Sequence, residues 1–234
     1  MTTQTPASIQ QPPSQPPVPS SPGRHLVRSA VLVASGAMLL LVGGLSAASL
    51  ASQRQETESF TAAGVREIVV EVESGHVTLL PGTGPDVEVT TTRHWSFTDA
   101  SAEHRIEDGV LTVTAECPWF GFGCRVSEEL TVPAGVAVRV QTAAGSIDAL
   151  DVDVASFEAE TAAGNVDASF TTAPSDISIA TSAGNVHVLV PADTYQVDAD
   201  ASAGNVDVGV SQSAGAQRSI RVETSAGNID IDAR

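Results

Sequence analysis

The chain has 234 residues, a length that allows one or two domains. Its 28 acidic residues and nine of its eleven arginines all lie after residue 53, so this part carries a net charge of −19. Such an acidic surface repels nucleic acid, anionic lipid headgroups and anionic wall polymers. The composition therefore excludes nucleic acid as a partner and favours proteins or neutral glycans.

The first residues are rich in proline and glutamine. Residues 11–19 read QPPSQPPVP, and the first 23 residues include no acidic or aromatic side chain. A segment of this kind cannot bury enough apolar surface to offset the entropy that it loses on ordering. We therefore predict that residues 1–25 form a disordered, proline-rich cytoplasmic tail.

An uncharged, strongly apolar segment follows. Residues 29–53 hold no charged side chain and exceed the length of about 20 residues that a membrane-spanning helix needs. Arg24 and Arg28 precede this segment, whereas Glu56 and Glu58 follow it, and basic residues favour the cytoplasmic side. We predict a single transmembrane helix over residues 26–52 of a cell-membrane protein, then a stalk over residues 53–64 and an extracytoplasmic domain. A cleaved signal peptide ending near Ala51 is the alternative.

The rest of the chain, residues 65–234, is built on a repeat. Versions of T-[AS]-A-G-N-[VI]-D recur with steps of 19, 20, 20 and 23 residues between their glycines. These glycines, and the asparagines that follow four of them, are Gly145, Gly164, Asn165, Gly184, Asn185, Gly204, Asn205, Gly227 and Asn228. A period near 20 residues is typical of a solenoid, in which each repeat packs on the next.

Apolar and polar residues alternate on both sides of each glycine. Ile177 and Ile179 precede Gly184, and Val186 and Val188 follow it, with mostly polar residues between them. This period of two indicates strands with one buried face, and Gly and Asn both tolerate the positive φ that a sharp bend needs. The sequence predicts an all-β fold, a parallel β-solenoid of strand–bend–strand repeats, with an antiparallel meander or sandwich as the alternative.

Two cysteines enclose an aromatic segment. Cys117 and Cys124 are close enough in an exported domain to form a disulfide, whereas a zinc site lacks further ligands. Between them lie Trp119, Phe120 and Phe122. We expect these rings either to form a recognition loop or to fold back and plug one end of the solenoid.

A row of acidic residues falls three positions after the glycines, at Asp148, Asp167, Asp207 and Asp230, with His187 in the remaining copy. We interpret this row as a solvated acidic face; Ca²⁺ bridging the carboxylates is the alternative, although the nine-residue repeat of Ca²⁺-binding β-rolls is missing. The sequence shows no nucleophile elbow, phosphate loop or zinc-protease motif. We predict a protein that is not an enzyme, with no catalytic residues, no metal site and no cofactor.

The repeated bends, together with V-P-A-G at residues 132–135 and V-P-A-D at residues 190–193, resemble a bacterial family of putative adhesins, also called toastrack domains. The resemblance covers about residues 60–234. It implies a β-helix-like domain tethered to the cell envelope, without established catalytic residues. Some members are associated with envelope-stress signalling. This chain has A-G-N at the bend where members often have S-G-D.

These features give two functional hypotheses. The first is a non-enzymatic, envelope-anchored binding module that partners an envelope protein in stress sensing, with Trp119, Phe120 and Phe122 as binding residues. The alternative is an adhesin or structural spacer that binds surface glycans or cell wall.

Overall fold

The computed structural model describes residues 54–96, 99–117 and 123–234. The expected tail, the expected membrane helix over residues 26–52, and Trp119, Phe120 and Phe122 lie outside these residues. Every element of regular secondary structure in these ranges is a β-strand. The described residues therefore include no helix that is long and apolar enough to span a bilayer.

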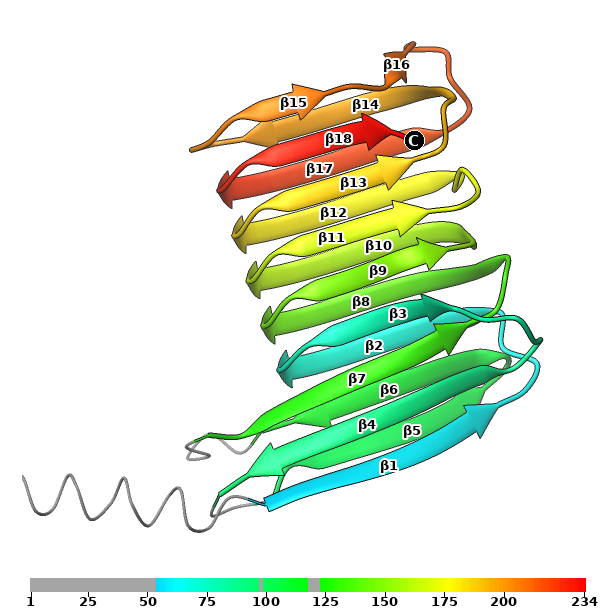
Figure 1. The fold of residues 1–234 in the computed structure, drawn as a ribbon, viewed down its shortest axis with the longest axis vertical. Helices are drawn as coiled ribbons and strands as arrows, with labels where there is room; N and C mark the ends of the chain where they lie inside the picture. The colour runs from blue at the N-terminus through cyan, green and yellow to red at the C-terminus, as the bar shows by residue number, and fades with distance from the viewer. Residues whose placement is uncertain (1–53, 97–98, 118–122) are drawn as a thin grey trace, which may run out of the picture. The chain divides into compact units, whose positions relative to one another are not determined.

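The strands form two nine-stranded sheets (Figure 1). The first sheet has the order β1-β4-β7-β3-β9-β11-β13-β18-β15, and the second has the order β16-β14-β17-β12-β10-β8-β2-β6-β5. The strand bounds are β1 Arg54–Ala62, β2 Glu67–Ser74, β3 Val77–Pro81, β4 Val87–Trp95, β5 Ser101–Glu107, β6 Val110–Glu116, β7 Arg125–Val132, β8 Val136–Ala144, β9 Ile147–Val152, β10 Val154–Ala163, β11 Val166–Phe170, β12 Asp176–Ala183, β13 Val186–Val190, β14 Thr194–Ala201, β15 Val206–Val208, β16 Ser211–Gln212, β17 Ser219–Ala226 and β18 Ile229–Ala233.

Each repeat is one coil, with a strand in the second sheet, a bend at its glycine, and a strand in the first sheet. The coils are β2/β3, β8/β9, β10/β11, β12/β13, β17/β18 and β14/β15, and neighbouring coils pair in parallel. The predicted all-β solenoid is therefore confirmed. Antiparallel pairs occur only near the start of the described chain, where β1 pairs with β4, β4 with β7, and β5 with β6.

The coils do not stack in chain order. β17/β18 lies between β12/β13 and β14/β15, and β2/β3 lies between β6/β7 and β8/β9 (Figure 1). The last coil of the stack is therefore β14/β15, although it precedes β17/β18 in the sequence. The bends and their spacing give no indication of this order, because they are nearly the same in every repeat.

The structure corrects the expected stalk. Residues 54–62 form β1, which pairs with β4 from Arg54 opposite Trp95 to Ala62 opposite Val87. The reason is that Phe60 and Ala62 alternate with polar residues and turn toward the core, where Ala62 is 1% exposed. The charged half of the strand remains exposed, as is common on edge strands.

The core lies between the two sheets. Valine and isoleucine supply most of it, and the inward apolar residues of the inner coils are at most 5% exposed; examples are Ile68, Val70, Ile147, Phe157, Val166, Ile177, Val186, Ile220 and Ile229. β-branched side chains suit this position because they pack well on a pleated surface. The predicted alternation thus assigns the faces of these strands correctly.

The bend glycines are required by the contact between coils. A Cβ added to any of Gly145, Gly164, Gly184, Gly204 and Gly227 would lie 1.5–1.9 Å from the carbonyl oxygen of the neighbouring bend. No side chain fits at that distance, so any larger residue would force the coils apart. Buried threonines complete the bend: Thr161, Thr181 and Thr224 donate hydrogen bonds to the glycine carbonyl of the neighbouring coil at 3.1–3.4 Å.

The asparagines act differently from the prediction. Asn165, Asn185, Asn205 and Asn228 do not have positive φ, which among the described non-glycine residues is found at Asp108 and Asp151. Instead they form a ladder in which the side-chain oxygen of one asparagine accepts the backbone N–H of the next. The distances are 2.9 Å for Asn165–Asn185 and Asn185–Asn228, and 3.0 Å for Asn228–Asn205.

Candidate functional site

An acidic groove lies on the outer face of the second sheet. It has a volume of about 590 Å³ and crosses β2, β6, β8 and β10. Four carboxylates line it, from Glu71, Glu73, Glu116 and Glu160, and its lining includes no basic residue. Gln141 lies between Glu71 and Glu160 in the parallel register and donates a hydrogen bond to Glu160 at 3.2 Å. The groove therefore offers negative charge to a cationic ligand.

The groove is connected to the cysteine pair. Cys117 and Cys124 form the predicted disulfide, with their Cα atoms 5.8 Å apart. The backbone N–H of Cys117 donates a hydrogen bond to the Glu73 carboxylate at 3.0 Å. The disulfide thus holds one end of the 117–124 segment beside an acidic residue of the groove.

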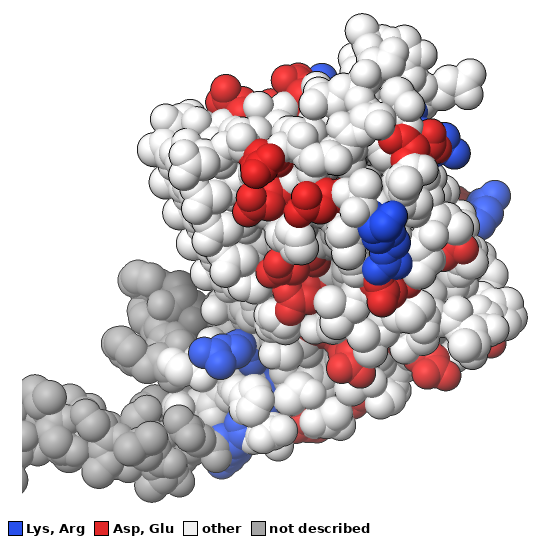
Figure 2. Space-filling view, turned by 45° about the horizontal axis from the view of Figure 1, so that its top comes forward, with Lys and Arg blue, Asp and Glu red and all other residues white. Residues whose placement is uncertain are grey.

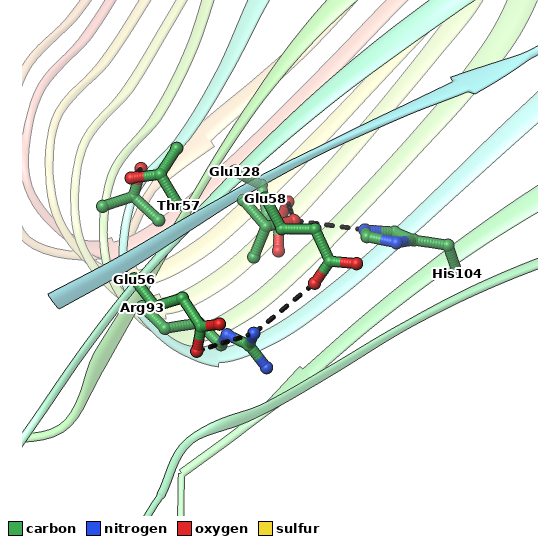
Figure 3. Close-up of polar contacts among 8 residues, drawn as sticks. Glu56, Thr57, Glu58, Arg93, His104 and Glu128 are labelled. Carbon is green, nitrogen blue, oxygen red and sulfur yellow. Dashed lines mark hydrogen bonds and ion pairs between the residues drawn. The ribbon is translucent and has the colours of Figure 1, made fainter.

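A buried polar network lies between the sheets near β1 and β5 (Figure 3). Glu128 on β7 is 1% exposed and accepts a hydrogen bond of 2.7 Å from the Thr91 hydroxyl. His104 Nε2 lies 3.1 Å from the same hydroxyl oxygen. The Thr91 hydroxyl donates its hydrogen to Glu128, so its oxygen accepts a hydrogen bond from His104. The imidazole proton of His104 therefore lies on Nε2. Phe60 stacks on His104 with ring centroids 5.1 Å apart.

The network continues toward solvent through Arg93. Its guanidinium pairs with Glu56 at 3.1 Å and with Glu58 at 3.4 Å (Figure 3). Among the residues that the structure describes, four buried polar atoms of this region find no hydrogen-bond partner; they are Arg93 Nε, Trp95 Nε1, Ser96 Oγ and Glu128 Oε1. Buried polar atoms without partners are uncommon in folded proteins. The polar atoms at this end of the two sheets therefore form fewer of their possible hydrogen bonds than those of the coils.

Burial controls the protonation of the network. It raises the pKa of Glu128 from 4.5 to about 7, against the opposing effects of the Thr91 hydrogen bond and the Arg93 charge. Burial also lowers the pKa of His104, which the charge of Glu58 opposes. Both side chains therefore favour their neutral forms in the folded protein. Glu128 does not line the acidic groove, so it is not placed to contact a ligand there.

Sequence reasoning missed this network. Neither His104 nor Glu128 belongs to a recognisable sequence motif. A signal was present in β7, where Glu128 occupies an inward position between Val126 and Leu130. A carboxylate at an apolar position of an alternating strand is worth testing as a buried titratable group.

The outward acidic row is present, with one break. Asp148 and Asp167 are neighbours in the register, as are Asp230 and Asp207, and His187 separates the two pairs. His187 Nδ1 lies 3.8 Å from Asp167, and its Nε2 lies 3.9 Å from Asp232. Within the described ranges no group of three or more His, Cys, Asp or Glu residues is arranged to hold a metal ion.

The fold and its acidic outer faces define a two-sheet β-solenoid domain. Residues 134–232 match the family model described as Toastrack DUF4097, which confirms the resemblance that the sequence indicates. The match begins at β8, yet both sheets continue through β1 to β7. The structure therefore extends the domain beyond the part that the family model recognises. No curated relative matches the sequence.

Solved structures show the same fold. A putative cell adhesion protein from Clostridium sporogenes aligns with a TM-score of 0.59 and 14% identity, over 77% of this chain and 100% of that chain. A putative adhesin from Bacteroides fragilis aligns with a TM-score of 0.38 and 8% identity, over 76% of this chain and 96% of that chain. At these identities the first likeness establishes the fold alone, and the second carries no further argument.

Proposed function

We propose that this protein is a non-enzymatic binding module of the bacterial cell envelope that binds another envelope protein in stress sensing. The acidic groove beside the disulfide is the observation that supports this proposal. Its four carboxylates lie on rigid parallel strands and have no basic residue in the lining to neutralise them. The expected anchor over residues 26–52 would tether the domain to the cell membrane.

The chemistry of the groove favours a basic, extended segment of a protein. A groove on the outer face of a sheet is open along the coils, so it suits a chain that lies across several strands. Glu71 and Glu160, on β2 and β10, present carboxylates at two separate points of the groove. Charges arranged in this way steer a complementary partner and set its register more than they add raw affinity.

Binding is favoured over catalysis by the position of the perturbed groups. General acid–base chemistry needs a titratable group within reach of a substrate and is most efficient when the pKa of that group lies near the working pH. The carboxyl group with a raised pKa, Glu128, is buried between the sheets, and the groove carboxylates lie on the other side of the second sheet.

The test is photo-crosslinking of the tagged, full-length protein in cells. A photoreactive amino acid replaces Gln141 in the groove or, as a control, Glu129 on the exposed face of the first sheet. We expect one dominant envelope protein to be captured from Gln141 and not from Glu129. The double variant Glu71→Gln, Glu160→Gln should lose this capture, whereas the variant Glu88→Gln, Glu129→Gln should keep it.

The other outcomes separate the two functional hypotheses. Capture of wall fragments, or of nothing beyond the protein itself, would support an adhesin or spacer and contradict a protein partner. The double variant Trp119→Ala, Phe120→Ala tests the aromatic segment in the same assay. Full capture by this folded variant would remove the aromatic residues from the binding site while leaving the groove as the candidate.

A further inference from the structure

The stack is open at the end formed by β14/β15. β15 is the last strand of the first sheet, and β16 pairs with β14 only at Thr194 and Tyr195. From Val197 to Val208, this coil has no further strand on its outer side in the part of the chain that the structure describes (Figure 1). This coil therefore has a neighbour on one side and an open edge on the other.

The open edge exposes residues that are buried in every inner coil. Val206 is 42% exposed, although the equivalent residues Val166, Val186 and Ile229 are 0% exposed. The inward-facing Val197 and Val208 are also only partly buried. An uncovered end of a parallel stack is a ready template for another strand, and the apolar residues here would gain burial from one.

The backbone of the last coil repeats the hydrogen-bonding pattern of the inner ones. The preceding coil donates to it, from Gly227 N to Ala203 O at 3.0 Å and from Ile229 N to Asn205 O at 2.9 Å. The equivalent amides of the last coil belong to Gly204 and Val206, and no described coil lies beyond them to accept. An added coil would continue the ladder with the same geometry.

The charges at this end specify the added segment. Asp207 is the register partner of Asp230, and Asp200 is the register partner of Glu223, so like charges are neighbours at both positions. Like charges directly opposite are destabilising. Other positions of neighbouring coils hold ion pairs, as Arg139 with Glu158 at 2.9 Å and Arg221 with Asp198 at 3.5 Å. Figure 2 shows the surplus of acidic over basic side chains on the face that includes this end.

We propose that the open edge of β14/β15 binds a segment of a partner protein in which apolar residues alternate with basic ones on both sides of a glycine. The segment adds as a further parallel coil. Its apolar residues cover Val206, its basic residues pair with Asp200 and Asp207, and its glycine faces the Gly204 carbonyl. A second copy joined through the same edge does not meet this requirement, because it would present a second acidic end. The surface is separate from the groove, so either proposal can fail alone.

The test uses the full-length protein and a synthetic peptide. The peptide carries residues 219–231 with Glu223→Arg and Asp230→Arg; the control peptide carries the same residues unchanged. We expect the arginine peptide to bind about tenfold more tightly, as two cross-strand charge pairs would give, and to lose this advantage at high salt. Hydrogen exchange should show protection confined to residues 197–208.

Matched variants of the protein locate the peptide. Asp200→Asn with Asp207→Asn should abolish the preference for the arginine peptide. Asp148→Asn with Asp167→Asn removes two neighbouring carboxylates of inner coils, outside the groove, and should leave binding unchanged. Equal binding of the two peptides, or loss of binding in the inner-coil variant, would overturn the proposal. A dimer that protects residues 197–208 without peptide would assign the edge to a second copy instead.

Discussion

Replacing Glu128 by glutamine should stabilise the protein in a manner that depends on pH. Burial raises the pKa of the Glu128 carboxyl from 4.5 to about 7. Below pH 4.5 the carboxyl is protonated in both the folded and the unfolded chain, so its charge costs nothing. Between pH 4.5 and 7 the unfolded chain loses its proton while the folded chain retains it, and the penalty on folding grows with pH. Above pH 7 the folded carboxylate is charged and the penalty reaches its limit.

The limit follows from the difference between the two pKa values. Each pKa unit corresponds to about 1.4 kcal/mol, so the penalty above pH 7 is about 3 kcal/mol. Glutamine has nearly the same shape, can accept the hydrogen bond from Thr91 and has no charge to desolvate. The Glu128→Gln variant should therefore exceed the native protein in free energy of unfolding by up to about 3 kcal/mol at pH 8, with a much smaller difference at pH 5.

Urea denaturation at pH 5, 6, 7 and 8, followed by far-UV circular dichroism, measures this difference. Glu129→Gln is the matched control, since Glu129 is the next residue on β7 and is exposed. Its effect should be small and nearly independent of pH. His104, whose pKa is lowered by burial, acts in the opposite sense, because its contribution is present above pH 6.5 and is lost as the pH falls. A Glu128→Gln effect of equal size at pH 5 and pH 8 would refute the reasoning.

Three further predictions concern the bends and the disulfide. Gly184→Ala should lower the free energy of unfolding by several kcal/mol, because its Cβ would lie 1.8 Å from the Gly164 carbonyl oxygen; Gly84→Ala, where nothing lies within 4 Å, is the control in the same thermal melts. Asn185→Ala should cost about 1 kcal/mol, since it removes the acceptor of an inter-coil hydrogen bond, and Asn205→Ala at the open end should cost less. Equal effects would show that the ladder contributes nothing. Reduction of the disulfide should cost about 2 kcal/mol in urea titrations; an unchanged midpoint would contradict this.

The fold could be predicted from the sequence to the extent that it depends on local patterns. The period of two assigned the buried faces, as at Ile177 and Val186, and the near-constant spacing of the glycines indicated parallel coils. The role of the asparagines could not be read in this way. Asparagine is suited both to a positive φ and to a ladder between coils. Which of the two forms depends on the distance between coils, which is a tertiary property.

The buried network and the acidic groove were harder to predict, because each joins residues that are far apart in the chain. Glu128 meets Thr91 and His104 only after β4, β5 and β7 have come together. The groove carboxylates of Glu73 and Glu116 come from different coils. Sequence reasoning found the cysteine pair beside the groove because a disulfide between close residues is a local feature.

The order of the last two coils follows from the size of their inward side chains. The coil β17/β18 presents Ile220, Val222, Ile229 and Ile231 to the core, and all four are at most 1% exposed. The coil β14/β15 presents smaller residues such as Val197 and Ala199, which remain partly exposed at the end. Exchanging the two coils would expose isoleucines and bury alanines, and apolar burial contributes about 25 cal/mol per Å². The chain therefore returns to insert its larger coil in the inner position, and the same choice leaves Val206 uncovered at the edge where we place the partner segment.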